Sequence, residues 1–124
     1  MTKATLQEIQ KIQVKIIFNS EKEPKFSYWK DGKICDGNVV VESPQIITYE
    51  LIESDGFVFV GAGFLNPFDG IIDEVVLSSD KRKLLLVDHD NVSGVTKFQL
   101  ILRHNNSGLL LISPDPQITN RREN

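Results

Sequence analysis

Apolar and polar side chains alternate along several short stretches of the chain, and this period of two residues is typical of β-strands. The clearest alternation lies within residues 95–104. Apolar side chains there share one face of the expected strand and polar ones share the other: Phe98, Leu100 and Leu102 against Lys97, Gln99 and Arg103. A strand with this pattern belongs to a sheet that has one buried and one solvated face.

Other short apolar runs predict further strands. They cover residues 11–18, 25–29, 38–42, 45–53, 57–60, 71–77, 83–88 and 109–113. Turn-forming residues separate the runs, and we expect hairpins at Asp31-Gly32 and at Ser54-Asp55-Gly56, because an Asp-Gly pair tolerates positive φ. Thr5 and Glu8 fit a capping box, which permits at most one helical turn before residue 10.

The number and spacing of these strands predict the fold class. Seven to nine short strands with turns between them are typical of two packed sheets. We therefore predict an all-β protein, a single antiparallel β-sandwich of about 7–9 strands. We expect one domain over residues 1–124, with flexible ends at 1–10 and 119–124.

Composition limits the partners and the location of the protein. The formal net charge is −3 and the basic residues are scattered, so nothing favours nucleic acid as a partner. The longest apolar runs are too short to span a bilayer, and we expect no membrane contact. The first residues contain no apolar leader and the single cysteine cannot form an internal disulfide, which together favour the cytoplasm.

The stretch GAGFLNPFDG, residues 61–70, resembles a dinucleotide-binding turn only in its first glycines. That fingerprint needs a further glycine where Asn66 stands, and then a helix, which Pro67 would end. We therefore interpret the stretch as a crossover between two sheets, in which the glycines allow a bulge. Phe64 and Phe68 either cap one end of the core or stay exposed as a contact patch.

Asp88, His89 and Asp90 bring two carboxylates and an imidazole together between two expected strands. A calcium loop would need an oxygen ligand where Val92 stands and a glycine where Ser93 stands. A zinc site would need more histidine or cysteine than this chain contains. We predict a structural turn here and no metal.

Residues suited to catalysis are scarce. Cys35 is the one thiol, and no glycine elbow or neighbouring base supports its activation by His89 or His104. We expect Cys35 to be a small, partly buried apolar residue. Asp73 and Glu74 are adjacent and would point to opposite faces of a strand, so they form no carboxylate pair. We predict no catalytic residue and no cofactor.

The chain ends in LISPDPQITNRREN, in which Asp115 and Pro116 follow the last expected strand. This Asp-Pro before Gln-Ile-Thr-Asn resembles the C-terminal tail of the DP-EP family of small bacterial proteins. The resemblance implies an immunoglobulin-like β-sandwich fold, and it implies no activity and no site residue. From its residue type, Asp115 is expected to accept main-chain hydrogen bonds in a turn.

These observations favour a non-catalytic binding or self-association module, whose partner is itself or another protein. The alternative is a site for a small ligand, for example a carbohydrate, on the loops 61–70 and 88–94. A third and less favoured alternative is an enzyme of unknown type. The candidate binding residues are Phe64, Asn66, Phe68, Asp88, His89, Asp90 and Asp115.

Overall fold

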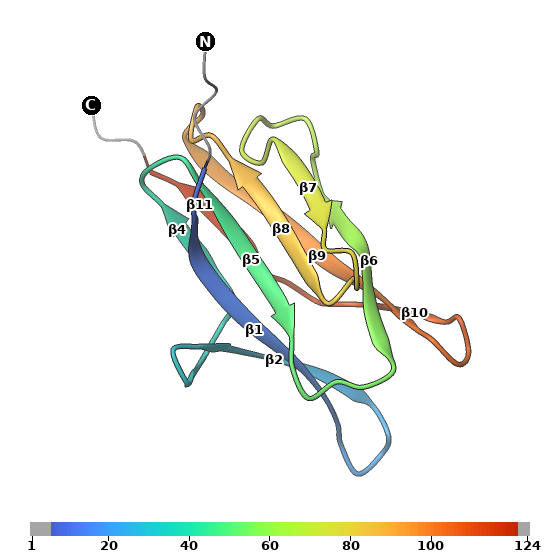
Figure 1. Cartoon of the computed structure of the whole chain (residues 1–124). Coiled ribbons are helices and arrows are strands. Elements are labelled where there is room, and N and C mark those ends of the chain that lie inside the picture. Colours follow the sequence, from blue (N-terminus) through green and yellow to red (C-terminus); the bar gives the residue numbers. More distant parts are fainter. Residues whose placement is uncertain (1–5, 122–124) are drawn as a thin grey trace.

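The computed structural model describes residues 6–121, which form two β-sheets and, within that range, no helix (Figure 1). The strands are β1 (Glu8–Phe18), β2 (Pro24–Lys30), β3 (Lys33–Cys35), β4 (Val39–Val41), β5 (Gln45–Leu51), β6 (Phe57–Phe64), β7 (Glu74–Leu77), β8 (Lys83–Asp88), β9 (Gly94–His104), β10 (Leu110–Ile112) and β11 (Gln117–Asn120). The all-β prediction is confirmed. The eleven strands exceed the number predicted, because β3 and β11, of three and four residues, are too short to show a period.

The strand order joins parts of the chain that lie far apart in the sequence. The first sheet has the order β3-β2-β1-β5-β8-β7. In the second sheet β9 pairs with β6 along one edge and with β10 and β11 along the other, and β4 lies outside β11. Strands β1 and β5 run parallel, as do β4 and β11. The prediction of an antiparallel sandwich is wrong for these pairs, because parallel neighbours are joined through distant crossovers that leave no local turn signal.

The two sheets lie face to face, and inward side chains of both fill the space between them (Figure 1). Contacts cross this space: the ring centroids of Tyr49 on β5 and Phe98 on β9 are 5.9 Å apart. The alternation predicted in β9 is confirmed, since Phe98, Leu100 and Leu102 are buried. The described part of the chain contains no helix of membrane-spanning length and hydrophobicity.

One of the two predicted hairpins forms and the other does not. Asp31-Gly32 joins β2 to β3, with φ of 51° and 78°. Ser54-Asp55-Gly56 instead carries the chain from β5 in the first sheet to β6 in the second. The Arg82 guanidinium holds this crossover by donating to the carbonyls of Ser54 and Phe57, each at 3.2 Å. The motif cannot distinguish the two outcomes, because both use a glycine with positive φ.

Strands extend into both end segments that we expected to be flexible. β1 begins at Glu8, and β11 follows the prolines of the tail. The pattern gives no sign of β11, because its four residues contain one apolar side chain, Ile118, which is fully buried. Thr5, at the start of the capping box, lies outside the described residues.

Candidate functional site

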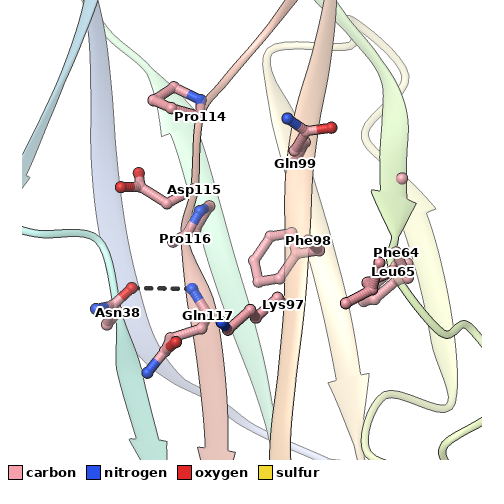
Figure 2. A pocket seen from close by; sticks show the side chains of 11 residues that line it. Asn38, Phe64, Leu65, Lys97, Phe98, Gln99, Pro114, Asp115, Pro116 and Gln117 are labelled. Atoms are coloured by element: carbon pink, nitrogen blue, oxygen red, sulfur yellow. Dashed lines mark hydrogen bonds between the residues drawn. The ribbon is translucent and has the colours of Figure 1, made fainter.

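An open cleft of about 780 Å³ crosses the outer face of the second sheet, from β6 over β9 to residues 114–117. Figure 2 shows Phe64 and Leu65 on one side of it, Asp115 and Asn38 on the other, and Lys97 with Gln99 on β9 between them. A volume of this size is within the range of small-molecule sites in proteins.

The floor of the cleft is bare because β6 presents glycine to the outer face of the sheet. A bulge at Val60 shifts the register, so that Gly61 pairs with Ile101 and Gly63 with Gln99. A Cβ at Gly63 would lie 3.5 Å from Ile101 Cδ1, and a Cβ at Gly61 would meet no atom within 4 Å. Neither glycine has a positive φ. The bulge lies at Val60, one residue before the glycines at which it was expected, and the lack of a side chain at Gly63 leaves space beside β9.

Phe64 and Leu65 form the apolar wall of the cleft. The Phe64 ring stacks on that of Phe98 with centroids 5.4 Å apart, so the core supports it. Leu65 N donates to Lys97 O at 3.1 Å, while the Leu65 side chain stays 85 % exposed. An exposed leucine fixed beside a core-supported ring offers a ligand a firm apolar surface.

Hydrogen bonds hold the opposite wall, residues 114–117, by its main chain. The Tyr28 hydroxyl donates to Asp115 O at 3.1 Å, and Ser113 Oγ donates to the same carbonyl. Burial raises the pKa of Tyr28, so its phenol stays protonated and able to donate. Gln117 N donates to Asn38 Oδ1 at 2.9 Å (Figure 2). The peptide bond between Asp115 and Pro116 is cis.

Several polar side chains of the cleft are free to contact a ligand. Lys97, Gln99 and Asp115 are exposed, and their side chains form no hydrogen bond or ion pair with residues 6–121. The expected turn contacts of the Asp115 carboxylate are therefore absent from this range, since its main-chain carbonyl is the group that accepts. Amide groups of Asn38 and Gln117 complete the polar side.

The two phenylalanines of the 61–70 loop have different environments. Phe64 packs against the buried core, whereas Phe68 is 91 % exposed. Asn66 stabilises the turn between them, because its Oδ1 accepts from Phe68 N at 3.0 Å. The hypothesis that both rings cap the core is therefore wrong for Phe68. The loop therefore carries an exposed aromatic ring at Phe68.

The turn at residues 88–90 does not line the cleft. Asp88 is fully buried, and its Oδ1 accepts from Asp90 N at 2.8 Å and from Asn120 Nδ2 at 3.1 Å. His89 is exposed, and its main-chain N donates to Asp73 Oδ2 at 2.8 Å. These bonds make the segment a hydrogen-bonded turn at the edge of the core.

Asp88 lies in a buried polar cluster that is incompletely hydrogen-bonded. Burial raises the pKa of Asp88 to about 6, with smaller contributions from the negative charges of Asp90 and Asp73, although hydrogen bonds to it act in the opposite direction. Asp88 Oδ2, Asn120 Oδ1 and Gln45 Oε1 have no hydrogen-bond partner among the described residues. Gln45 is the neighbour of Asp88 in the pairing of β5 with β8.

The structure gives no support to a metal centre or a thiol nucleophile. Within residues 6–121, no group of three or more His, Cys, Asp or Glu side chains is arranged to hold a metal ion. Cys35 packs against the core as a partly buried residue, as expected. His104 Nδ1 lies 2.9 Å from Ser107 Oγ, and no hydrogen bond in the described range joins Cys35 to a histidine.

Comparison with known proteins identifies a family for most of the sequence. The model of the DP-EP family matches residues 10–122 of this sequence, a range that includes both walls of the cleft. The chain belongs to the DP-EP family. The resemblance of the tail to DP-EP proteins is thereby confirmed. Among curated proteins, none matches the sequence.

The cleft of this DP-EP protein brings together two of the candidate residues, Phe64 and Asp115. Asn66 and Phe68 lie on the adjoining loop. The alternation in the sequence places Lys97 and Gln99 on a solvated face but gives no reason to select them as site residues. The sequence does not reveal that β6 pairs with β9. This pairing places a glycine of β6 beside these side chains.

Proposed function

We propose that this DP-EP protein is a non-catalytic binding domain that holds a small polar ligand in the cleft across β9. The cleft itself carries the proposal: about 780 Å³, with an apolar wall and unpartnered polar side chains around a bare floor. Small-molecule sites combine these features, because apolar contact supplies affinity and a few placed polar groups fix orientation. No residue of the cleft pairs a nucleophile with a base, so binding is favoured over catalysis.

The chemistry of the lining favours a carbohydrate or a similar polyhydroxylated molecule. The amides of Asn38, Gln99 and Gln117 can each donate and accept, which matches neighbouring hydroxyl groups that do the same. The exposed Leu65 side chain and the edge of Phe64 suit the C–H face of a sugar ring. Lys97 and Asp115 have opposite charges, so the cleft as a whole attracts neither a strong anion nor a strong cation.

A substitution on β6 tests the proposal. In Gly63→Val the new side chain fills the floor, where a Cβ has ordinary contact with Ile101 and no backbone strain arises. Gly61→Val is the matched control, because it places the same side chain on the same strand face without lining the cleft. We expect a panel of mono-, di- and trisaccharides to yield a binder by calorimetry, and we expect Gly63→Val to weaken it by at least about tenfold.

The control variant should bind within about twofold of the unmodified protein. Equal binding by Gly63→Val and the unmodified protein would place the ligand elsewhere. Absence of binding across the panel, at concentrations up to about 10 mM, would reject the carbohydrate class.

The finer classification of the protein is also a proposal. We infer that its two packed sheets form an immunoglobulin-like sandwich, which the family match and the face-to-face sheets support. We infer a reducing compartment such as the cytoplasm from the free Cys35. Mass spectrometry of the thiol after alkylation in cells tests the second inference, and a blocked or oxidised Cys35 would contradict it.

A further inference from the structure

Strand β10 has one paired edge and one free edge. Within residues 6–121, β10 pairs with β9 alone. His104 N donates to Leu109 O, and Ser113 N donates to Leu100 O. Antiparallel hydrogen bonds recur at every second residue, so the main-chain groups of Leu110 and Ile112 point away from β9. Figure 1 shows the hairpin that leads into β10 projecting beyond the sheet.

The free edge of β10 is apolar and lacks the charged residues that commonly prevent an edge strand from pairing with another chain. Leu109, Leu110 and Ile112 are 71 %, 60 % and 52 % exposed. No acidic or basic residue occurs in the segment 105–114. Outer strands of the other sheet carry charge, for example Lys33 on β3, which is a common means of preventing edge pairing. An apolar, uncharged edge with free donors and acceptors requires another strand to cover it.

We infer that β10 of one chain pairs with β10 of a second copy in antiparallel orientation, with Leu111 of each copy opposite Leu111 of the other. This pairing is independent of the proposed ligand. It joins the second sheets of two copies into one continuous sheet across a two-fold axis, which is the symmetry of most homodimers.

The register selects a second copy as the partner. In this arrangement Leu110 of each copy exchanges both main-chain hydrogen bonds with Ile112 of the other, so every free group of the strand finds a partner. The extended segment is also symmetric about Leu111: Gly108, with φ of 75°, limits it on one side. Pro114 limits it on the other, because proline has no N–H to offer at the next free position.

The side chains and charges agree with this register. Leu110 and Ile112 lie opposite Arg103 and Ile101 of β9, so both project from the outer face of the sheet. Across the two-fold axis, Leu110 of one copy meets Ile112 of the other, and apolar cross-strand pairs of this kind stabilise sheets. The Arg103 side chains of the two copies lie in different rows of the joined sheet, so like charges are not placed opposite each other.

Sedimentation velocity over roughly a hundredfold range of protein concentration tests the pairing. We expect a monomer–dimer equilibrium that Ile112→Lys weakens at least about tenfold, because each charged side chain would then lie opposite the apolar Leu110 of the other copy. Ile34→Lys is the matched control: Ile34 on β3 is 67 % exposed, and its exchange should leave the equilibrium unchanged. Leu110→Pro removes a free-edge N–H without breaking the β9 ladder, and it should act like Ile112→Lys.

A cross-linking experiment tests the register in a Cys35→Ser background. Opposed residues of a non-hydrogen-bonded pair have Cα atoms about 4.5 Å apart, within disulfide range, so Leu111→Cys should form a covalent dimer on mild oxidation. Leu109→Cys should not, because in this register it lies opposite Ser113. A monomer at every concentration, a dimer unaffected by Ile112→Lys, or cross-linking through residue 109 in preference to 111 would each overturn the inference.

Discussion

Exchange of the buried Asp88 for asparagine should stabilise the protein at neutral pH and leave it almost unchanged at low pH. Asp88 is fully buried, and its Oδ2 has no hydrogen-bond partner among the described residues. An asparagine keeps the shape and keeps the oxygen that accepts from Asp90 N and Asn120 Nδ2. It removes the charge whose burial is unfavourable.

The size of the effect follows from the pKa of Asp88. Burial raises this pKa from 3.8 to about 6. One unit corresponds to about 1.4 kcal/mol, so ionisation of Asp88 lowers the free energy of unfolding by about 3 kcal/mol. The stability that the protein gains from holding Asp88 in its neutral form is fully present below pH 3.8. This stability is lost as the pH rises through about 6. Most of the loss is complete by about pH 7.

Urea denaturation of both proteins between about pH 4 and pH 8 gives the measurement. We expect the free energy of unfolding of Asp88→Asn to exceed that of the unmodified protein by about 3 kcal/mol at pH 8 and by only about 0.6 kcal/mol at pH 4. Asp55→Asn, at an exposed turn position, is the control and should give a small difference that does not vary with pH. A variant that is less stable than the unmodified protein at pH 8 would show that the carboxylate has a stabilising partner.

Two further predictions concern single positions near the cleft and the core. Phe64→Ala should lower the free energy of unfolding by about 2 kcal/mol, because its ring stacks on the core, whereas Phe68→Ala should change it by less than about 0.5 kcal/mol. Thermal and urea denaturation check both, and equal losses would contradict the different environments of the rings. Gly37→Ala should cost more than about 2 kcal/mol, since φ is +82° and the new Cβ would lie 2.8 Å from Tyr28 Cγ. Gly32→Ala has a similar φ and open space, and we expect a loss of about 1 kcal/mol in the same assay; equal losses at the two glycines would show that the ring contact is harmless.

The sequence predicts those parts of the fold that are recorded in local periodicity. In the run 95–104, Phe98, Leu100 and Leu102 share one face, and this apolar face is the buried face of β9. β11 could not be predicted, because a four-residue strand with one apolar side chain, Ile118, has no readable period. Its neighbours are β9 and β4, and such long-range pairing depends on the whole core.

Part of the candidate site could likewise be predicted from residue type, whereas the rest depends on pairing between strands that are distant in the sequence. A loop with Phe64 and a tail with Asp115 stand out by residue type, and the structure brings both to one cleft. The stretch 61–70 is a sheet crossover, as expected, but its first two glycines belong to β6, and Gly63 lies in the floor of the cleft. Only the pairing of Gly63 with Gln99 reveals that role. Asp88 is buried whereas several of the other candidate residues are exposed, and residue type alone could not predict this difference.

The binding function is tested most directly by nuclear magnetic resonance of the ¹⁵N-labelled protein, titrated with the saccharide panel. We predict concentration-dependent shifts of main-chain amide signals along the cleft, at Gly63, Lys97, Gln99 and Gln117, and the loss of these shifts in Gly63→Val but not in Gly61→Val. Shifts confined to residues 88–94, or spectra that stay unchanged with every saccharide, would contradict the proposal that the cleft is a carbohydrate site.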